Sequence, residues 1–188
     1  MKRIKDYLLP TFILFVICSV SALLLGATNE ITKGRIAEND AKAAKEAMET
    51  VMPGCTFGNE GENEYGSYAV AYDNEGNVAG YAVTAIGKGG YDGEIKLMVG
   101  ITVDGKVSEI GTGAAISVLD NSETPSVGGK VIKNLEWFKS FIGLEGGAAL
   151  TKSGGKIDAV SGATKTSTGI TDGVNNALKC YSEIKGVN

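Results

Sequence analysis

The residues with the clearest chemical potential lie in one short run, DAVSGATKTSTGI, from Asp158 to Ile170. The run holds five hydroxyl side chains, Ser161, Thr164, Thr166, Ser167 and Thr168. A hydroxyl becomes a good nucleophile only when a base lies within hydrogen-bond reach. The chain has no histidine, the side chain that most often supplies such a base. We therefore do not expect the cluster to be a self-activating nucleophilic site.

Two uses remain for these hydroxyls. Ser161-Gly162 is a turn signal before the final predicted helix, which places Thr164 just upstream of a helix N-terminus. Free N–H groups and the helix dipole favour a phosphate at such a position. Gly162 and Ala163 leave space beside the backbone, and Lys165 adds a positive charge. The run can hold a phosphate, noncovalently or as an ester, and the alternative is a Ser/Thr-rich helix cap.

Composition excludes several classes of function. The 188 residues have room for one membrane anchor and one domain. The net charge is −4 and no basic face is visible, so we expect no nucleic-acid partner. The three cysteines, Cys18, Cys55 and Cys180, lack CxxC spacing, so neither a zinc site nor an iron–sulfur cluster is expected. Cys55 and Cys180 are predicted to be free thiols, with a disulfide between them as the alternative.

The N-terminus has the pattern of a membrane anchor. Residues 1–6 include Lys2, Arg3 and Lys5, and residues 7–27 carry no charge. About 20 apolar residues cross a hydrocarbon core. The basic flank predicts a cytoplasmic N-terminus, with the rest of the chain on the extracytoplasmic face of the cell membrane. The alternative is a cleaved signal peptide.

The predicted organisation has four parts: a cytoplasmic tail (1–6), a transmembrane anchor (7–27), a linker with a spacer helix (28–58) and an extracytoplasmic domain (59–188). The spacer helix is expected over residues 39–52 and ends at Pro53-Gly54. Turn signals at residues 73–76 and at Asp104-Gly105 predict two hairpins. Their strands are expected over residues 65–72 and 78–86, then 95–103 and 107–112. The two hairpins are similar in sequence, either by duplication or by coincidence.

Two further helices are expected, over residues 129–142 and 168–184. In the helix expected over residues 129–142, a stripe of apolar residues at helical spacing and the neighbouring Trp137 are predicted to pack in the core. That stripe contains Val131, Leu135, Phe138 and Ile142. In the second, the stripe contains Ile170, Val174, Ala177, Leu178, Tyr181 and Ile184. Hairpins grouped apart from helices predict an α+β domain of antiparallel hairpins and packed helices.

The hydroxyl run also carries a resemblance. Asp158-Ala159-Val160-Ser161-Gly162-Ala163-Thr164 is similar to the D-x-x-S-G-A-T signature of FMN-binding domains that carry FMN on the final threonine through a phosphoester. The resemblance implies that Thr164 accepts the flavin and that Ser161, Gly162 and Ala163 form the recognition turn, with Asp158 at its start. It also implies a partner, an FAD-dependent flavin transferase, which would supply the chemistry that this chain lacks.

Two more elements resemble one family, the G subunits of Rnf electron-transport complexes. Gly89-Gly90-Tyr91-Asp92-Gly93 with the strand after it resembles the family's glycine-rich loop, and Glu123-Thr124-Pro125 with Gly128 resembles its E-T-P-G-L-G element. The sequence departs from the family at Ser126-Val127, where Gly-Leu is usual, and at Asn121, where histidine is frequent. These departures concern the surroundings of the flavin ring. The resemblance spans nearly the whole chain.

The family implies roles for these residues that compete with simpler ones. Gly90 and Tyr91 lie either in a plain loop or against the flavin, and Glu123 and Thr124 either cap a helix or line the flavin pocket. The implied function is a membrane-anchored electron-carrier subunit with covalent FMN. It would work beside the other Rnf subunits, which couple ferredoxin–NAD electron transfer to ion translocation. The alternatives are a free-standing extracytoplasmic flavoprotein and a non-redox module that binds an anion.

Overall fold

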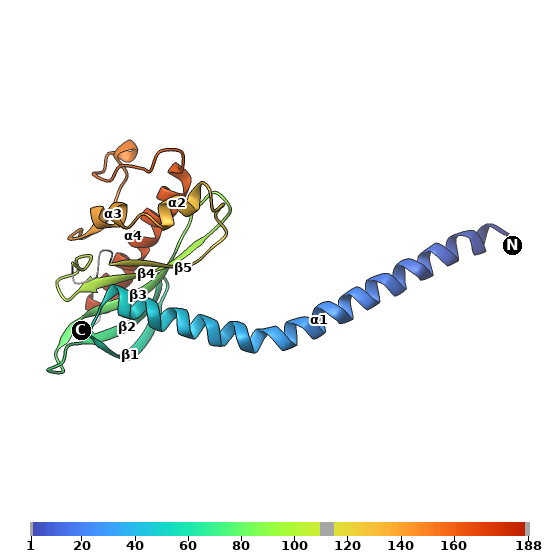
Figure 1. Cartoon of the computed structure of the whole chain (residues 1–188), viewed down its shortest axis with the longest axis horizontal. Helices are drawn as coiled ribbons and strands as arrows, with labels where there is room; N and C mark the ends of the chain where they lie inside the picture. Colours follow the sequence, from blue (N-terminus) through green and yellow to red (C-terminus); the bar gives the residue numbers. More distant parts are fainter. Residues whose placement is uncertain (1, 110–114, 187–188) are drawn as a thin grey trace. The chain divides into compact units, whose positions relative to one another are not determined.

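The computed structural model describes residues 2–109 and 115–186 (Figure 1). Contacts group the chain into two units, one up to Ala43 and one from Ala44 onward. In chain order the helices and strands are α1 (Lys2–Val51), β1 (Thr56–Asn63), β2 (Gly66–Tyr72), β3 (Val78–Gly87), β4 (Ile95–Thr102), β5 (Ile116–Asn121), α2 (Gly128–Ile132), α3 (Leu135–Phe138), the 3₁₀ turns η1 (Lys139–Phe141) and η2 (Thr151–Ser153), and α4 (Thr164–Gly186). The predicted α+β class, with an apolar N-terminal helix before an antiparallel sheet and packed helices, is confirmed. The functional boundaries predicted at residues 27 and 58 stay predictions.

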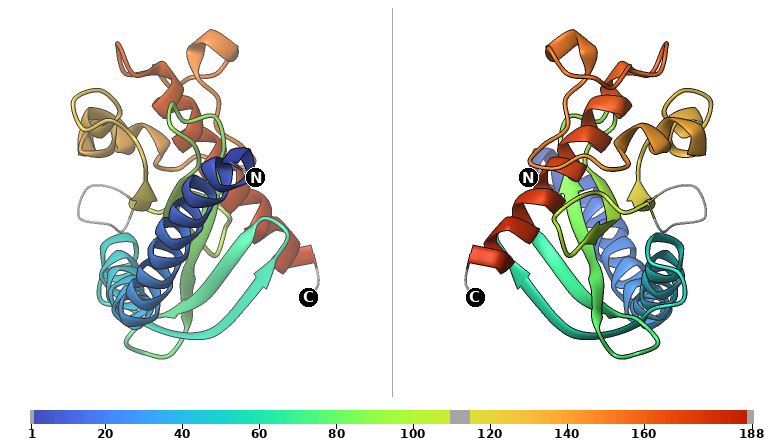
Figure 2. Two further views of the ribbon diagram at one scale, coloured as in Figure 1. Left: turned by 90° about the vertical axis from the view of Figure 1, so that its right-hand side faces the viewer. Right: turned by 90° about the vertical axis from the view of Figure 1, so that its left-hand side faces the viewer.

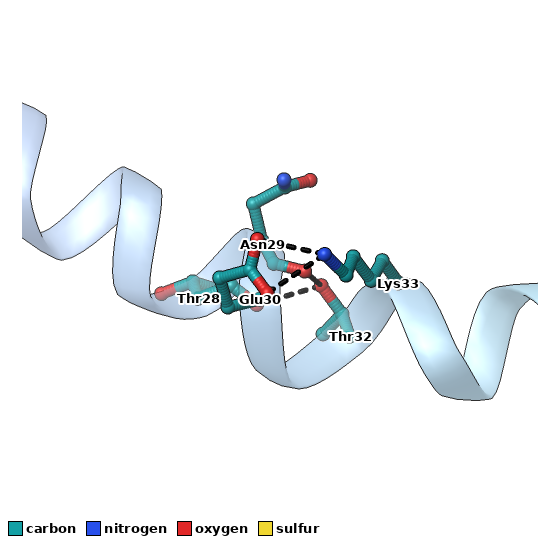
Figure 3. Close-up of polar contacts among 5 residues, drawn as sticks. All are labelled: Thr28, Asn29, Glu30, Thr32 and Lys33. Carbon is teal, nitrogen blue, oxygen red and sulfur yellow. Dashed lines mark hydrogen bonds and ion pairs between the residues drawn. The ribbon is translucent and has the colours of Figure 1, made fainter.

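Helix α1 is longer than the sequence predicted. The anchor and the spacer helix expected over residues 39–52 belong to one helix, which has no break near residue 39. Just after the apolar run, the Thr32 hydroxyl donates to the carbonyl of Thr28 at 2.7 Å, and Lys33 pairs with Glu30 at 2.8 Å (Figure 3). These polar groups find their partners within the helix, which continues without a break past the apolar segment.

The sheet is a five-stranded antiparallel meander in the order β1-β2-β3-β4-β5. The predicted hairpin between β2 and β3 is confirmed. Asp73 shapes its turn, because its carboxylate accepts the backbone N–H groups of Glu75 and Asn77 at 2.8 and 2.9 Å. Two strands were missed. β1 is largely polar and exposed, and β5 is short, so neither shows a clear alternation of buried residues.

The second predicted hairpin forms its turn and a short pairing beside it, but no second strand. Gly105 has a left-handed φ of 83°, and Val107 makes a single bridge to Ile101. The backbone of Val107 also bonds to Leu144 and Gly143, each at 2.9 Å, and the last bond to β4 is the one from the Ser108 N–H to the Gly100 carbonyl at 2.8 Å. The strand expected over residues 107–112 is therefore wrong for 107–109, and residues 110–112 lie outside the described chain.

Helix α4 packs on one face of the sheet, against β2, β3 and β4 (Figure 2). Its predicted apolar stripe is confirmed as core, with Ile170, Val174 and Ala177 fully buried. The helix begins at Thr164, so this residue is the first of the helix rather than upstream of it. On the opposite face, Val51 and Met52 at the end of α1 pack against Ala71, Ala82 and Met98. The sheet is thus covered on both faces.

The helix expected over residues 129–142 is broken into α2, α3 and η1. Asn134 causes the break, because its backbone leaves the helical region and its side chain accepts the N–H of Trp137 at 3.0 Å to cap α3. Val131, Phe138 and Trp137 do pack in the core as predicted, but Leu135 is exposed. This segment lies between β5 and the hydroxyl run.

Candidate functional site

The turn before α4 is held by hydrogen bonds of its own. The backbone N–H of Ala163 donates to Val160 at 3.0 Å, and Gly162 takes a left-handed φ of 78° that suits glycine. The buried hydroxyl of Ser167 accepts the N–H of Val160 at 3.1 Å and donates to the carbonyl of Ala163 at 3.0 Å. Ser167 therefore has a structural role, because it ties the turn to the start of the helix.

The five hydroxyls have different surroundings. Thr166 and Ser167 are buried and hydrogen-bonded. The hydroxyl of Thr168 donates to the Thr164 carbonyl at 2.8 Å and accepts from Lys152 at 3.2 Å. Ser161 and Thr164 are exposed, and Thr164 lines a pocket to which Ser161 does not contribute. Thr164 is thus the one member of the cluster that is both exposed and a lining residue of this pocket.

That pocket has a volume of about 560 Å³ and is built from three segments of the chain. They are the loop between β3 and β4, the segment after β5, and the turn that enters α4. The lining residues are Tyr91, Glu123, Thr124, Val127, Gly162, Ala163, Thr164, Lys165 and Thr166. Seven of the predicted site residues therefore meet in one place, although they come from distant parts of the sequence.

Three predicted site residues do not line this pocket. Ser161 is exposed at the turn, and Asp158 is exposed before it, with its backbone carbonyl accepting the Trp137 indole N–H at 2.6 Å. Gly90 lies behind the pocket wall, where a Cβ atom would sit 2.7 Å from a carboxylate oxygen of Glu123. The Asp158 backbone is thus tied to Trp137, and Gly90 leaves room for the Glu123 carboxylate.

Sequence reasoning missed two lining residues, Val127 and Thr166. Val127 was noted only as a departure from the family pattern, and its side chain is 45% exposed beside the pocket. Thr166 was counted among the hydroxyls without a role. Its position two residues after Thr164 was the available signal, but only the contact to Glu123 shows what it does.

An aromatic ring and a cation stand at the pocket. Tyr91 is 68% exposed, and the Lys165 ammonium lies 5.5 Å from the centre of its ring. An exposed tyrosine face next to a cavity is suited to stacking on a planar aromatic ligand. Lys165 and the N-terminus of α4 are suited to an anion, since both present positive potential there.

Glu123 is the acidic residue of the pocket wall. It is 8% exposed, and its two oxygens accept the backbone N–H of Tyr91 and the hydroxyl of Thr166, each at 2.7 Å. Nearby, the Thr124 hydroxyl donates weakly to Asp92 at 3.4 Å. In the described part of the chain no group of three or more His, Cys, Asp or Glu residues is placed to hold a metal ion.

Comparison with known proteins identifies both parts of the chain. Residues 1–51 match the RnfG N-terminal region, and residues 90–179 match the FMN-binding domain. The G subunit of the ion-translocating oxidoreductase complex of Methanosarcina acetivorans is 32% identical, over 91% of this chain and 92% of its own length.

The chain belongs to the family of Rnf complex G subunits. Two other G subunits in this family are similar over most of their length. That of the Na⁺-translocating ferredoxin:NAD⁺ oxidoreductase complex of Acetobacterium woodii is 30% identical, over 92% of this chain and 90% of its own. The G subunit of the proton-translocating ferredoxin:NAD⁺ oxidoreductase complex of Clostridium ljungdahlii is 29% identical, over 92% of this chain and 90% of its own length.

As in an anchored protein, one described helix is long and apolar enough to cross a membrane. It starts near the N-terminus, its most apolar stretch has a mean hydropathy of 2.6, and none of that stretch is buried. Exposed apolar side chains along this part of α1 would be costly in water and are favourable in lipid. The helix therefore fits a membrane anchor.

The pocket residues fit an FMN group. A cavity of about 560 Å³ is in the size range of small-molecule sites. Tyr91 and Val127 offer apolar and aromatic surface for an isoalloxazine ring, while Thr164, Lys165 and the start of α4 are placed for its phosphate. When bound, the flavin supplies the capacity to accept and pass on electrons, and the protein supplies position and electrostatics.

Proposed function

We propose that this chain is the membrane-anchored electron-carrier subunit of an Rnf-type complex that couples ferredoxin–NAD electron transfer to ion translocation. Its FMN is joined to Thr164 through a phosphoester, and an FAD-dependent flavin transferase makes the bond. The other Rnf subunits are its partners in the membrane. The chain serves as a redox subunit rather than an enzyme by itself, since the cofactor carries the chemistry.

One observation carries the proposal: of the five clustered hydroxyls, only that of Thr164 is exposed and faces the pocket. A transferase must reach the accepting hydroxyl, and the attached flavin must then find a cavity beside it. Ser167 and Thr166 do not meet the first condition because they are buried. Ser161 is exposed but does not line the pocket, so a flavin attached there would lack the same support.

Within the proposed site each residue has a separate part. Ser161, Gly162 and Ala163 form the turn that a transferase recognises, and Gly162 permits its left-handed backbone. Lys165 offsets phosphate charge, and Tyr91 and Thr124 border the flavin ring. The first turn of α4 orients the phosphate through its free N–H groups.

The deciding experiment is intact-mass analysis of the full chain, produced in membranes together with a flavin transferase. The wild type should gain the mass of FMN minus water, and its flavin fluorescence should survive denaturation. Thr164→Val should lose both, and Ser182→Ala, which changes an exposed serine on α4 outside the recognition turn, should keep both. A wild type without added mass, or a Thr164→Val variant that still carries flavin, would contradict the attachment.

A second experiment tests the complex. The native membrane assembly is purified through a tag on this chain, and co-purifying subunits are identified by mass spectrometry. Recovery of the other Rnf subunits supports the proposal. Recovery of the flavinylated chain alone, under conditions that preserve the assembly, would favour a free-standing flavoprotein.

A further inference from the structure

Three segments of the chain meet at the carboxylate of Glu123. One oxygen accepts the backbone N–H of Tyr91 from the β3–β4 loop, and the other accepts the hydroxyl of Thr166 from the first turns of α4. Both distances are 2.7 Å, which is short and typical of hydrogen bonds to a charged group. Glu123 itself belongs to the segment after β5. We call these three residues the Glu123 clasp.

The surroundings of the clasp leave the carboxylate little freedom. A Cβ atom on Gly90 would lie 2.7 Å from one carboxylate oxygen. A Cβ atom on Gly128 would lie 2.7 Å from the Thr166 hydroxyl and would collide with the other oxygen. Contacts this close force a shift, so any side chain at Gly90 or Gly128 would displace Glu123. The two glycines therefore leave the space that the clasp occupies.

The clasp joins the two sides of the pocket. Tyr91 presents its ring from one side, and Thr164, two residues before Thr166, stands on the other. Because one carboxylate holds both segments, it sets the distance between the attachment point and the ring that borders the flavin. Two hydrogen bonds to a charged group, each stronger than a bond between neutral groups, hold the loop firmly.

The same carboxylate places a buried negative charge in the pocket wall. In the described part of the chain Glu123 forms no ion pair, so no cation offsets this charge directly. An electron that enters a flavin without a proton adds one negative charge to it. Like charges repel more strongly in a poorly solvated site than in water, so the carboxylate opposes that addition.

We propose that Glu123 is a positioning residue of the flavin site that also lowers the reduction potential of the flavin. This inference rests on the proposed function, since it takes the pocket for the flavin site. Glu123 acts on Thr164 and Tyr91 through the backbone, and on the flavin through its charge. The hydrogen bonds from the Thr166 hydroxyl and the Tyr91 N–H fix the position of the charged carboxylate.

The charge is tested with Glu123→Gln in the FMN-loaded full chain. Glutamine has the same shape, can accept the Tyr91 N–H and can donate to the Thr166 hydroxyl, so it keeps the clasp and removes the charge. The flavin potential is measured by equilibrium titration with dithionite as electron donor and a redox dye as reference. Glu123→Gln should shift the potential to a more positive value.

The matched control is Glu94→Gln, which removes the same charge from an exposed position on the same loop. Solvent screens the charge of Glu94, so the flavin potential of the Glu94→Gln variant should stay near that of the wild type. Equal shifts in the two variants, or no shift in Glu123→Gln, would overturn the electrostatic part of the inference.

The clasp is tested in the flavin-free full chain, produced without a transferase. The exchange of the Tyr91 amide proton is followed by NMR. Glu123→Met, which cannot accept a comparable hydrogen bond, should speed this exchange about tenfold or more. Thr166→Val should speed it less, because the Tyr91 contact remains. Unchanged exchange in a folded Glu123→Met protein would overturn the clasp, and if that variant does not fold, unchanged exchange in Thr166→Val would do so.

The experiments distinguish a failure of the proposed function from a failure of the inference about Glu123. If the wild type takes up no FMN, the proposed function and the predicted effect on the flavin potential are both wrong. The exchange rate of the Tyr91 amide proton still tests the clasp in that case. A wild type that is flavinylated on Thr164 but has the same potential as Glu123→Gln leaves the proposed function standing and overturns the role of the charge.

Discussion

Neighbouring hydroxyls at the start of α4 do different work because each meets different partners. Ser167 is fully buried and joins the backbone of Val160 to that of Ala163. Thr166 is held by Glu123, and Thr168 bonds back to its own helix. Thr164 is left exposed on the pocket. Burial and hydrogen bonding thus decide which hydroxyl is available for modification.

Ser167→Ala tests the structural half of the cluster. The Ala163 carbonyl would keep the backbone N–H of residue 167, at 3.0 Å, but the N–H of Val160 would lose its partner. A fully buried unsatisfied donor costs about 1–3 kcal/mol, and because Val160 is only half-buried the loss should lie near the lower end of that range. Urea unfolding followed by circular dichroism should show that loss. Ser182→Ala, an exposed serine on the same helix, should change stability by less than about 0.5 kcal/mol, and an equal loss there would contradict the prediction.

Cys180 gives a second prediction at this scale. Burial of the thiol raises its pKa to about 11, although a hydrogen bond with Asn63 opposes the rise. The reactive thiolate would then be about one part in a thousand at pH 8. We expect maleimide to leave Cys180 unmodified in the folded chain and to modify it only after denaturation. Cys55 is partly exposed and should react in the folded chain. Peptide mapping after a timed reaction decides this, and rapid labelling of Cys180 in the folded chain would refute it.

At the scale of elements, close packing of α4 on the sheet outweighs helix propensity. Gly173 weakens an isolated helix by up to about 1 kcal/mol relative to alanine. In the fold, a Cβ atom there would lie 2.7 Å from the Leu97 side chain and 3.2 Å from the backbone N of Gly87. On the facing strand, a side chain on Gly87 would collide with the Gly169 carbonyl. The helix and β3 therefore approach each other through glycines.

Gly173→Ala should consequently destabilise the protein rather than stabilise it. Overpacking costs about 1–3 kcal/mol, which exceeds the gain in propensity. Thermal unfolding should show a lower midpoint for this variant. Gly186→Ala, at the end of α4 with open space around it, should leave the midpoint nearly unchanged. A higher midpoint for Gly173→Ala would show that the helix shifts without cost.

At the scale of the whole molecule, the chain combines an apolar helical segment with a domain that contains the pocket. The uncharged residues 7–27 follow Lys2, Arg3 and Lys5, and this order favours a cytoplasmic N-terminus. We therefore expect the domain, and the flavin on Thr164, on the extracytoplasmic face. Placement on that face would also require a transferase that works there.

A C-terminal alkaline phosphatase fusion tests this orientation in whole cells, because the enzyme is active only outside the cytoplasm. The fusion should be active, and replacement of Lys2, Arg3 and Lys5 by glutamine should lower its activity. A fusion to residues 1–6 alone should be inactive. An inactive full-length fusion would place the domain in the cytoplasm and contradict the predicted localisation.

The sequence by itself determined the features that depend on near neighbours. The apolar stripe of α4, the hairpin around Asp73 and the run of residues 7–27 were predicted because helical periodicity, turn chemistry and unbroken hydropathy are local. The polar edge strand β1 and the break at Asn134 escaped prediction, because one lacks alternation and the other depends on a side-chain cap.

Tertiary structure alone decided how the pocket is built. Glu123 meets Tyr91 across 32 positions and Thr166 across 43, and no periodicity links residues so far apart. Val127 and Thr166 joined the lining, while Asp158, Ser161 and Gly90 did not, since the path of the backbone determines which side chains share a cavity. Packing of the surrounding segments buries Thr166 and Ser167 but leaves Thr164 exposed, although these hydroxyls are chemically alike.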